Sequence, residues 1–215
     1  TKPCIEAVEA MAKAMTDAWG NPSALYGFGI DTAHTLRDAR RKVAAAMGAE
    51  PDRVFFTSGG TEADNWAIFS TVKRFGKRGK HIITTAIEHS AVLEPCKALE
   101  KQGYEVTYLQ PDRQGNITVE QVAEALREDT VLVSMMLVNN ETGSVLPVAE
   151  VGKLLKRRKS AALLHCDAVQ GFLKVPFTPS ELGCDFLSVS GHKVGAPKGI
   201  GALYIRETLR KKFPP

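Results

Sequence analysis

Four consecutive residues, Ser190-Gly191-His192-Lys193, combine side chains that could do chemistry. They follow an apolar run over residues 185–189, which predicts a short buried strand. Lysine is almost never buried without a partner, and an amine held in a pocket can form a Schiff base with an aldehyde cofactor. A loop lysine with its ammonium group in water is the ordinary alternative. On these four residues alone, that alternative is the better interpretation.

The segment Thr57-Ser58-Gly59-Gly60-Thr61-Glu62 has the composition of a phosphate site. It follows a predicted strand and opens a predicted helix, whose first backbone N–H groups have no partner within the helix. Glycine lets the backbone approach an anion closely, and the Thr61 hydroxyl can add a donor. It is not a Walker loop, because no lysine follows the second glycine. The alternative is an ordinary strand-to-helix turn with Thr61 as the N-cap residue.

Other strand ends carry groups of different kinds. His89 can stack on an aromatic ring and exchange protons near neutral pH. The amide of Asn140 can hydrogen-bond a ring hydroxyl, and Gln170 can face the same ligand from a turn. Asp167 ends a strand that should be buried, so its carboxylate needs a cationic or hydrogen-bonding partner. Each also has an ordinary explanation: a surface or capping histidine, an asparagine turn, and an aspartate that caps a turn.

Together these motifs supply an anion cradle, a stacking imidazole, a buried carboxylate and a strand-end amine. The set matches the phosphate, ring face, ring nitrogen and aldehyde of pyridoxal 5′-phosphate (PLP). None of the motifs is specific by itself, whereas their combination is.

Strand and helix patterns alternate between the motifs. Apolar residues at helical spacing predict helices at about 3–18, 32–47, 62–75, 91–101, 119–127 and 148–158. In the second of these, Asp31 is the expected N-cap and Gly48 the expected C-terminal glycine. Short apolar runs predict strands at 54–57, 82–85, 105–109, 131–138, 162–166, 186–189 and 202–205. This alternation predicts an α/β fold, with a mostly parallel central sheet and helices on both faces. Ligands bind at the carboxyl ends of the strands in such sheets, where the motifs lie.

The composition narrows the class of protein. A chain of 215 residues, 44% hydrophobic and 24% charged, is typical of a globular protein in solution. A net charge of +4 is too small to indicate nucleic-acid binding, and no apolar run is long enough to span a bilayer. The four cysteines are widely scattered and show no spacing typical of metal ligands, so we expect free thiols, no metal and a cytosolic protein.

Six segments, in this order, resemble the cysteine desulfurases of the class V aminotransferase family. These enzymes have the fold-type I architecture of PLP-dependent transferases, a three-layer α/β/α large domain. The resemblance covers nearly the whole chain. The segments are Gly20-Asn21-Pro22-Ser23, residues 56–63, Glu88-His89-Ser90, residues 139–143, Asp167-Ala168-Val169-Gln170, and residues 190–193 with 197–201.

The resemblance implies a role for each candidate residue. Lys193 would bond to the cofactor aldehyde and move protons at the substrate carbon. His89 would stack on the ring and assist acid–base steps, and Asp167 would pair with the ring nitrogen. The remaining implied contacts are Asn140 and Gln170 on the ring hydroxyl side, and Gly60, Thr61, Ser190 and His192 on the phosphate.

The implied reaction converts L-cysteine to L-alanine and leaves sulfur as a persulfide on an enzyme cysteine. The resemblance also implies a homodimer in the cytoplasm or an organellar matrix. It would pass sulfur to an acceptor protein for iron–sulfur cluster or thio-cofactor synthesis. The family's persulfide cysteine lies well downstream of the lysine, and no cysteine of this chain stands there. We therefore expect residues 1–215 to be the PLP-binding large domain, truncated at both ends, without the small C-terminal domain.

Two other kinds of function stay open on the sequence. The chain could belong to a selenocysteine lyase or another class V aminotransferase. It could also be a non-catalytic scaffold or binding module that keeps the fold. Lys193, Asp167 and His89 argue against a scaffold, because a protein without a cofactor would not need that combination.

Overall fold

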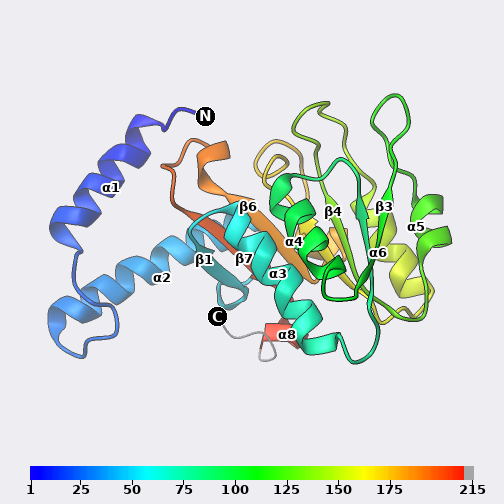
Figure 1. The fold of residues 1–215 in the computed structure, drawn as a ribbon. Helices are drawn as coiled ribbons and strands as arrows, with labels where there is room; N and C mark the ends of the chain where they lie inside the picture. Colours follow the sequence, from blue (N-terminus) through cyan, green and yellow to red (C-terminus); the bar gives the residue numbers. More distant parts are fainter. Residues whose placement is uncertain (211–215) are drawn as a thin grey trace.

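A seven-stranded sheet forms the centre of the molecule in the computed structural model, which describes residues 1–210 (Figure 1). The strand order is β1-β7-β6-β5-β4-β2-β3. Strand β7 is antiparallel to β1 and β6, and the other neighbours are parallel, which confirms the predicted mostly parallel sheet. The strands are β1 (Val54–Thr57), β2 (His81–Thr85), β3 (Glu105–Leu109), β4 (Thr130–Met136), β5 (Leu163–Asp167), β6 (Phe186–Ser190) and β7 (Gly201–Ile205).

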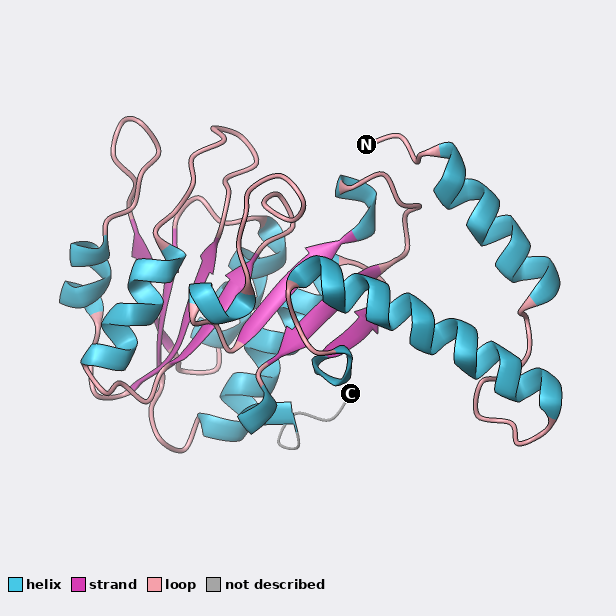
Figure 2. Cartoon of the chain, turned by 180° about the vertical axis from the view of Figure 1, so that it is seen from behind, coloured by secondary structure: helices cyan, strands magenta, loops and turns pink. Residues whose placement is uncertain are grey.

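Helices cover both faces of this sheet, as predicted (Figures 1 and 2). The longer ones are α1 (Ile5–Asp17), α2 (Gly27–Met47), α3 (Gly60–Phe75), α4 (Ser90–Glu100), α5 (Val119–Ala125) and α6 (Val148–Arg157). Short helical turns complete the described part: η1 (Pro51–Arg53), α7 (Pro179–Leu182), η2 (Gly191–Lys193) and α8 (Glu207–Arg210).

Two hydrophobic cores, one on each side of the sheet, hold these layers together. Successive strand residues point to opposite faces, so Ile82 and Leu132 pack toward α3 and α4. Their neighbours Ile83 and Val133 pack on the other face, with residues of α2, α5 and α6. Strands buried on both faces need continuous apolar runs, which is why these strands are recognisable in the sequence. Each large apolar side chain buried in this way stabilises the fold by roughly 1.5–3 kcal/mol.

Two helix starts differ from the prediction. Helix α2 begins at Gly27, so Asp31 lies inside it and Tyr26 occupies the N-cap position. The Tyr26 carbonyl already accepts the Ile30 N–H at 3.1 Å, which starts the helix one turn early. Helix α3 begins at Gly60 with Gly59 as its N-cap residue, so Thr61 is not the cap. The predicted end of α2 is confirmed, because Gly48 has a left-handed φ of 66°.

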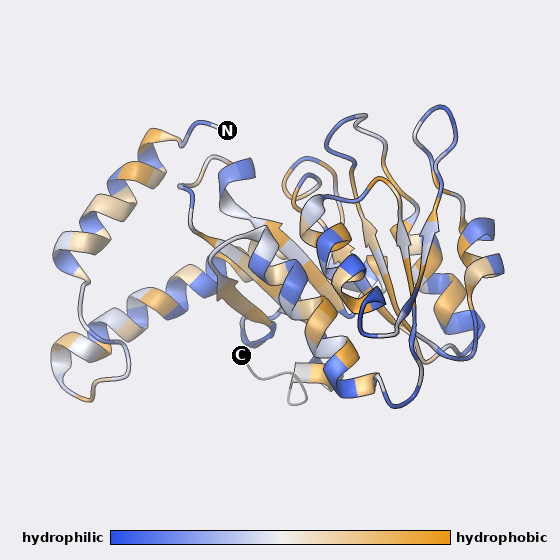
Figure 3. Cartoon of the chain, in the orientation of Figure 1, coloured by the Kyte–Doolittle hydropathy of each residue, from blue (hydrophilic) through white to orange (hydrophobic). Residues whose placement is uncertain are grey.

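Helix α1 contributes nothing to either core. It has no buried residue, and Ile5 and Met15, which gave it an amphipathic pattern, are 63% and 71% exposed. Figure 3 shows hydrophobic residues along this helix, which lies apart from the sheet. No helix in residues 1–210 combines the length and the hydropathy that crossing a membrane requires.

Candidate active site

The carboxyl ends of β4, β5 and β6 border a cavity that the start of α3 and the loop after β2 complete. All nine residues singled out in the sequence line this cavity. The structure therefore brings together groups that lie up to 133 positions apart in the chain, from Gly60 to Lys193. The nine are Gly60, Thr61, His89, Asn140, Asp167, Gln170, Ser190, His192 and Lys193.

The start of α3 forms one end of the cavity, where backbone N–H groups without helical partners meet the loop after β6. A Cβ atom at Gly60 would lie 2.7 Å from Cγ2 of Val169, so only glycine fits there. Across from it, Ser190 Oγ lies 2.8 Å from Nδ1 of His192. Burial and the positive charge of Lys193 lower the pKa of His192. These features give this end the chemistry of an anion site.

Asp167 supplies a buried carboxyl group deeper in the cavity. Its side chain accepts the Val169 N–H at 2.9 Å, and the residue is only 6% exposed. Burial, reinforced by the charge of Asp64, raises the pKa of Asp167 to about 7. Within residues 1–210, no lysine or arginine forms an ion pair with it. A cationic ligand group would supply the partner that this carboxylate lacks.

His89 is both a helix cap and a wall of the cavity. It is the N-cap residue of α4, and its Nδ1 accepts the Ala91 N–H at 3.1 Å. The sequence left open whether this histidine caps a helix or faces a ligand. In the structure, His89 caps α4 and also lines the cavity. The hydrogen bond fixes the orientation of the imidazole ring, because Nδ1 must point toward the helix.

The two neighbouring asparagines, Asn139 and Asn140, have different roles. Asn139 is buried, and its side chain makes the turn: Oδ1 accepts the Glu141 N–H at 2.9 Å, and Nδ2 donates to the Ile87 carbonyl at 2.9 Å. Asn140 is exposed and lines the cavity, with Nδ2 at 2.6 Å from Glu141 Oε1. This segment therefore contains both predicted features: Asn139 forms the turn, and Asn140 lines the cavity.

Lys193 ends the short helical turn η2 that follows β6, and it is half-buried. Its side chain forms no ion pair with any described residue, which leaves the amine available in the cavity. Gln170 also lines the cavity, where Oε1 accepts a hydrogen bond from Lys174 Nζ at 3.1 Å.

Four further residues line the cavity that sequence reasoning missed: Asp64, Met136, Val138 and Val169. A signal for Asp64 was available. It follows Gly60 by four positions, so the two share a helix face, and Ala63 and Ala67 point to that face as the buried one. Nothing in the sequence distinguished the three apolar residues from other core positions.

A family model described as aminotransferase class-V matches residues 1–215. The chain belongs to the class-V aminotransferase family. The cysteine desulfurase IscS of Methanosarcina thermophila is 47% identical to it over 205 residues, which are 95% of this chain and 50% of that protein. The cysteine desulfurase IscS of Dictyoglomus turgidum is 46% identical over 202 residues, 94% of this chain and 51% of that protein. This class-V chain therefore spans about half the length of the curated relatives it matches.

Solved structures show the same fold. A NifS-like protein has a TM-score of 0.93 at 40% identity, covering 96% of this chain and 57% of that one. A structure described as SspA in complex with cysteine has a TM-score of 0.94 at 37% identity, covering 100% of this chain and 61% of that one. The fold of this class-V chain is thus that of the fold-type I PLP enzymes, as the sequence predicted.

Proposed function

We propose that this chain is the cofactor-binding large domain of a PLP-dependent cysteine desulfurase. The observation that carries the proposal is the convergence of all nine predicted residues on one cavity. The class-V family match and the relatives named cysteine desulfurases support it. The reaction would convert L-cysteine to L-alanine and pass the sulfur on as an enzyme persulfide.

The cavity fits PLP at both of its polar ends. The start of α3, where a Cβ at Gly60 would clash, can receive a phosphate on backbone N–H groups, with Thr61, Ser190 and His192 around it. The buried carboxyl of Asp167 can meet a protonated ring nitrogen, which would also remove the cost of leaving that charge unpaired. Asn140 and Gln170 also line the cavity, and we assign their side-chain amides to the ring hydroxyl.

Lys193 and His89 are the residues to which we assign chemistry. The bound cofactor would supply an electron sink for the substrate's α-carbon. The Lys193 amine would bond to the cofactor aldehyde until the substrate amine displaces it, and the freed amine would then hold and return the proton of that carbon. His89, oriented by its bond to Ala91, would stack its ring over the cofactor and leave Nε2 free for proton exchange.

We assign the sulfur-accepting role to none of the four cysteines. Cys96, Cys166 and Cys184 are buried, and burial raises the pKa of each thiol, which suppresses the thiolate needed for attack. Cys4 is exposed, with its backbone N–H bonded to the Gly195 carbonyl at 2.8 Å, and it does not line the cavity. The proposal places the persulfide cysteine outside these 215 residues, together with a small C-terminal domain.

We also infer that the protein forms a homodimer, passes sulfur to an acceptor protein and is located in the cytoplasm or an organellar matrix. The exposed apolar side chains of Ile5, Met15 and Trp19 support association, since they form part of neither core. Light scattering on the full-length protein tests the oligomeric state, and a monomer in solution would contradict the inferred homodimer.

The deciding experiment is addition of PLP to the purified chain. We expect a visible absorbance band, and borohydride reduction followed by peptide mapping should place the cofactor on Lys193. Lys193→Ala should abolish the band. Lys198→Ala is the matched control, because this exposed lysine lies five residues away and does not line the cavity. A colourless wild-type protein, or a band that survives in Lys193→Ala, would overturn the proposal.

The cysteine assignment has its own test. With PLP and L-cysteine, this chain alone should form little or no protein persulfide, as measured by thiol-specific labelling and mass spectrometry. Robust persulfide on any of its cysteines would show that the sulfur acceptor lies within residues 1–215.

A further inference from the structure

A second buried carboxyl group, on Asp64, borders the cavity beside Asp167. Asp64 lies one turn into α3 from Gly60, and only 1% of its surface is exposed. The helix that would hold a phosphate at its start therefore also brings a carboxyl group against β5 and β6. A buried carboxylate is costly unless it is paired, so its surroundings need an explanation.

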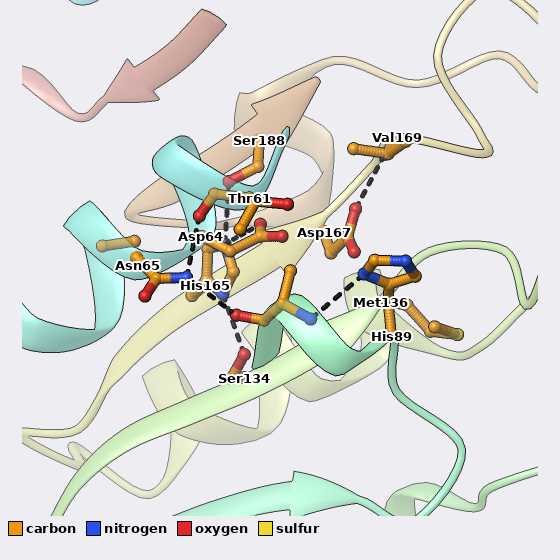
Figure 4. Close-up of polar contacts among 12 residues, drawn as sticks. Thr61, Asp64, Asn65, His89, Ser134, Met136, His165, Asp167, Val169 and Ser188 are labelled. Carbon is orange, nitrogen blue, oxygen red and sulfur yellow. Dashed lines mark hydrogen bonds and ion pairs between the residues drawn. The ribbon is translucent and has the colours of Figure 1, made fainter. Parts of the chain in front are cut away.

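The surroundings of Asp64 are polar. Among residues 1–210, His165 is the one side chain within ion-pair distance of Asp64, and it would be a cation only if protonated. Asp64 Oδ1 lies 3.3 Å from Nε2 of His165 and has no hydrogen-bond partner among the described residues. His165 is fully buried, with Nδ1 at 2.8 Å from Ser134 Oγ and Nε2 at 3.0 Å from Ser188 Oγ. Figure 4 shows this chain of contacts beside Asp167 and His89.

The charges in this cluster favour a neutral Asp64. Burial lowers the pKa of His165 to about 4, so its imidazole is neutral at physiological pH and offers no cation to a carboxylate. Burial raises the pKa of Asp64 to about 7, an effect that the Ser188 hydroxyl partly offsets. After burial, a negative charge on Asp64 would be the next cause to raise the pKa of Asp167. Two like charges close together in a dry site cannot both form easily.

The two carboxyl groups differ in what stabilises their anions. Asp167 accepts the Val169 N–H, and this hydrogen bond lowers its pKa. Asp64 instead faces an imidazole nitrogen, which can accept a carboxyl proton. The titratable groups around the pair are His165 and Cys166 on β5, Glu88 and His89 after β2, and His192 and Lys193 after β6.

We propose that Asp64 is a positioning residue for Asp167: it holds the one proton that the pair shares, directed toward His165, and so leaves Asp167 as the single carboxylate in the cavity. The inference rests on the proposed function in one respect, since the cation that Asp167 awaits is the cofactor's ring nitrogen. Asp64 itself would not touch the cofactor nitrogen. It would act by keeping a second negative charge away from Asp167.

The test is a carbon-13 NMR titration of the aspartate carboxyl groups in the protein without cofactor. In Asp167→Asn, the pKa of Asp64 should fall by about one pH unit, because the neutral isostere removes the negative charge that Asp64 faces when it loses its proton. In the reciprocal Asp64→Asn, the pKa of Asp167 should stay where it is, because asparagine is as neutral as the protonated Asp64 carboxyl. A merely structural role for Asp64 would leave its titration unchanged in Asp167→Asn.

Asp185→Asn is the matched control. Asp185 is a buried aspartate at the opposite end of β6, ion-paired with Arg206 at 2.6 Å, and it does not line the cavity. Its replacement should leave the Asp64 and Asp167 titrations unchanged. A fall of the Asp167 pKa in Asp64→Asn, or an Asp64 pKa that does not fall in Asp167→Asn, would overturn the proposal. If Asp64→Asn does not fold, an Asp64 carboxyl that titrates near its ordinary value in the wild type and in Asp167→Asn would overturn it equally.

PLP titrations of the same proteins separate this inference from the proposed function. If the wild type fails to bind PLP, the proposed function fails, while the carboxyl coupling is still measured without cofactor. If PLP binds and Asp167→Asn leaves the Asp64 titration unchanged, the proposed function stands and the role of Asp64 is wrong. We expect both PLP binding and coupling.

Discussion

Ser190 Oγ and His192 Nδ1 lie 2.8 Å apart at the end of β6. This contact joins two of the residues assigned to phosphate before any ligand arrives. If Nδ1–H donates to Oγ, the serine hydroxyl proton is free to point into the cavity toward an anion. Burial of His192, and next the nearby positive charge of Lys193, lower the pKa of His192. The negative charge of a bound phosphate would raise that pKa again. The pair is therefore preorganised for an anion.

Ser190→Ala should weaken phosphate binding. Loss of one hydrogen bond to a charged group costs about 1.5 kcal/mol, which corresponds to about tenfold in affinity. Calorimetric titration with PLP, and with inorganic phosphate as a competitor, measures the change. Ser180→Ala, on the exposed surface at α7, is the control and should bind like the wild type. Equal affinity of Ser190→Ala and wild type would remove Ser190 from the anion site.

The two glycines at the start of α3, Gly59 and Gly60, should respond differently to alanine. A Cβ at Gly60 would meet Val169 Cγ2 at 2.7 Å, and valine is too stiff to move away cheaply. Gly60→Ala should therefore lower the free energy of unfolding by about 1–3 kcal/mol and weaken PLP binding. At Gly59 a Cβ has nothing within 4 Å, and φ of 162° is extended backbone, so Gly59→Ala should stay close to wild type. Urea unfolding of both variants checks this. Equal losses of unfolding free energy in Gly59→Ala and Gly60→Ala would show that the clash with Val169 does not cause the destabilisation.

Glu88 should make stability depend on pH. Its Oε1 accepts hydrogen bonds from Thr85 Oγ1 at 2.8 Å and the Met136 N–H at 2.9 Å, and burial raises its pKa to about 8. The unfolded chain releases this proton near the ordinary pKa of 4.5, so the folded state loses stability as pH rises from about 4.5 to 8. Glu88→Gln removes the titration and should gain relative to wild type across that range, by roughly 2–4 kcal/mol.

Glu88→Ala is the companion variant for that measurement. It leaves the Thr85 and Met136 donors without their acceptor, so it should be less stable than Glu88→Gln by about 2–4 kcal/mol at every pH. Unfolding curves from pH 5 to pH 8.5 distinguish the two variants. A difference between Glu88→Gln and wild type that does not change with pH would mean that Glu88 is ionised in the folded state.

His89 should show separable roles in stability and in cofactor binding. Its Nδ1 caps α4 through the Ala91 N–H, so His89→Ala should cost about 1 kcal/mol of stability. Asparagine is a good N-cap residue, so His89→Asn should keep most of that stability. Neither variant has a ring to stack, so both should weaken PLP binding and alter its absorbance. Thermal unfolding without PLP, followed by PLP titration, separates the two effects. Wild-type PLP affinity in His89→Asn would confine His89 to capping.

Much of the fold could be predicted because its central strands are buried on both faces. Ile82 and Ile83 face opposite cores, and such strands appear in the sequence as uninterrupted apolar runs. Helix starts were less predictable. Asp31 is a good N-cap residue by type, yet α2 begins before it, and the Tyr26 carbonyl accepts the first helical hydrogen bond from the Ile30 N–H.

The kinds of group at the site could be predicted from the amino-acid sequence, since a lysine, a histidine and an aspartate at strand ends carry their chemistry in their side chains. Which of these groups meet depends on how the chain packs in three dimensions. The fold inserts β7 between β1 and β6, sets Gly60 against Val169, and buries Asp64 beside Asp167. Burial and the coupling of charges depend on distances through space. Those distances arise when segments more than a hundred residues apart pack on one sheet, so local sequence patterns cannot supply them.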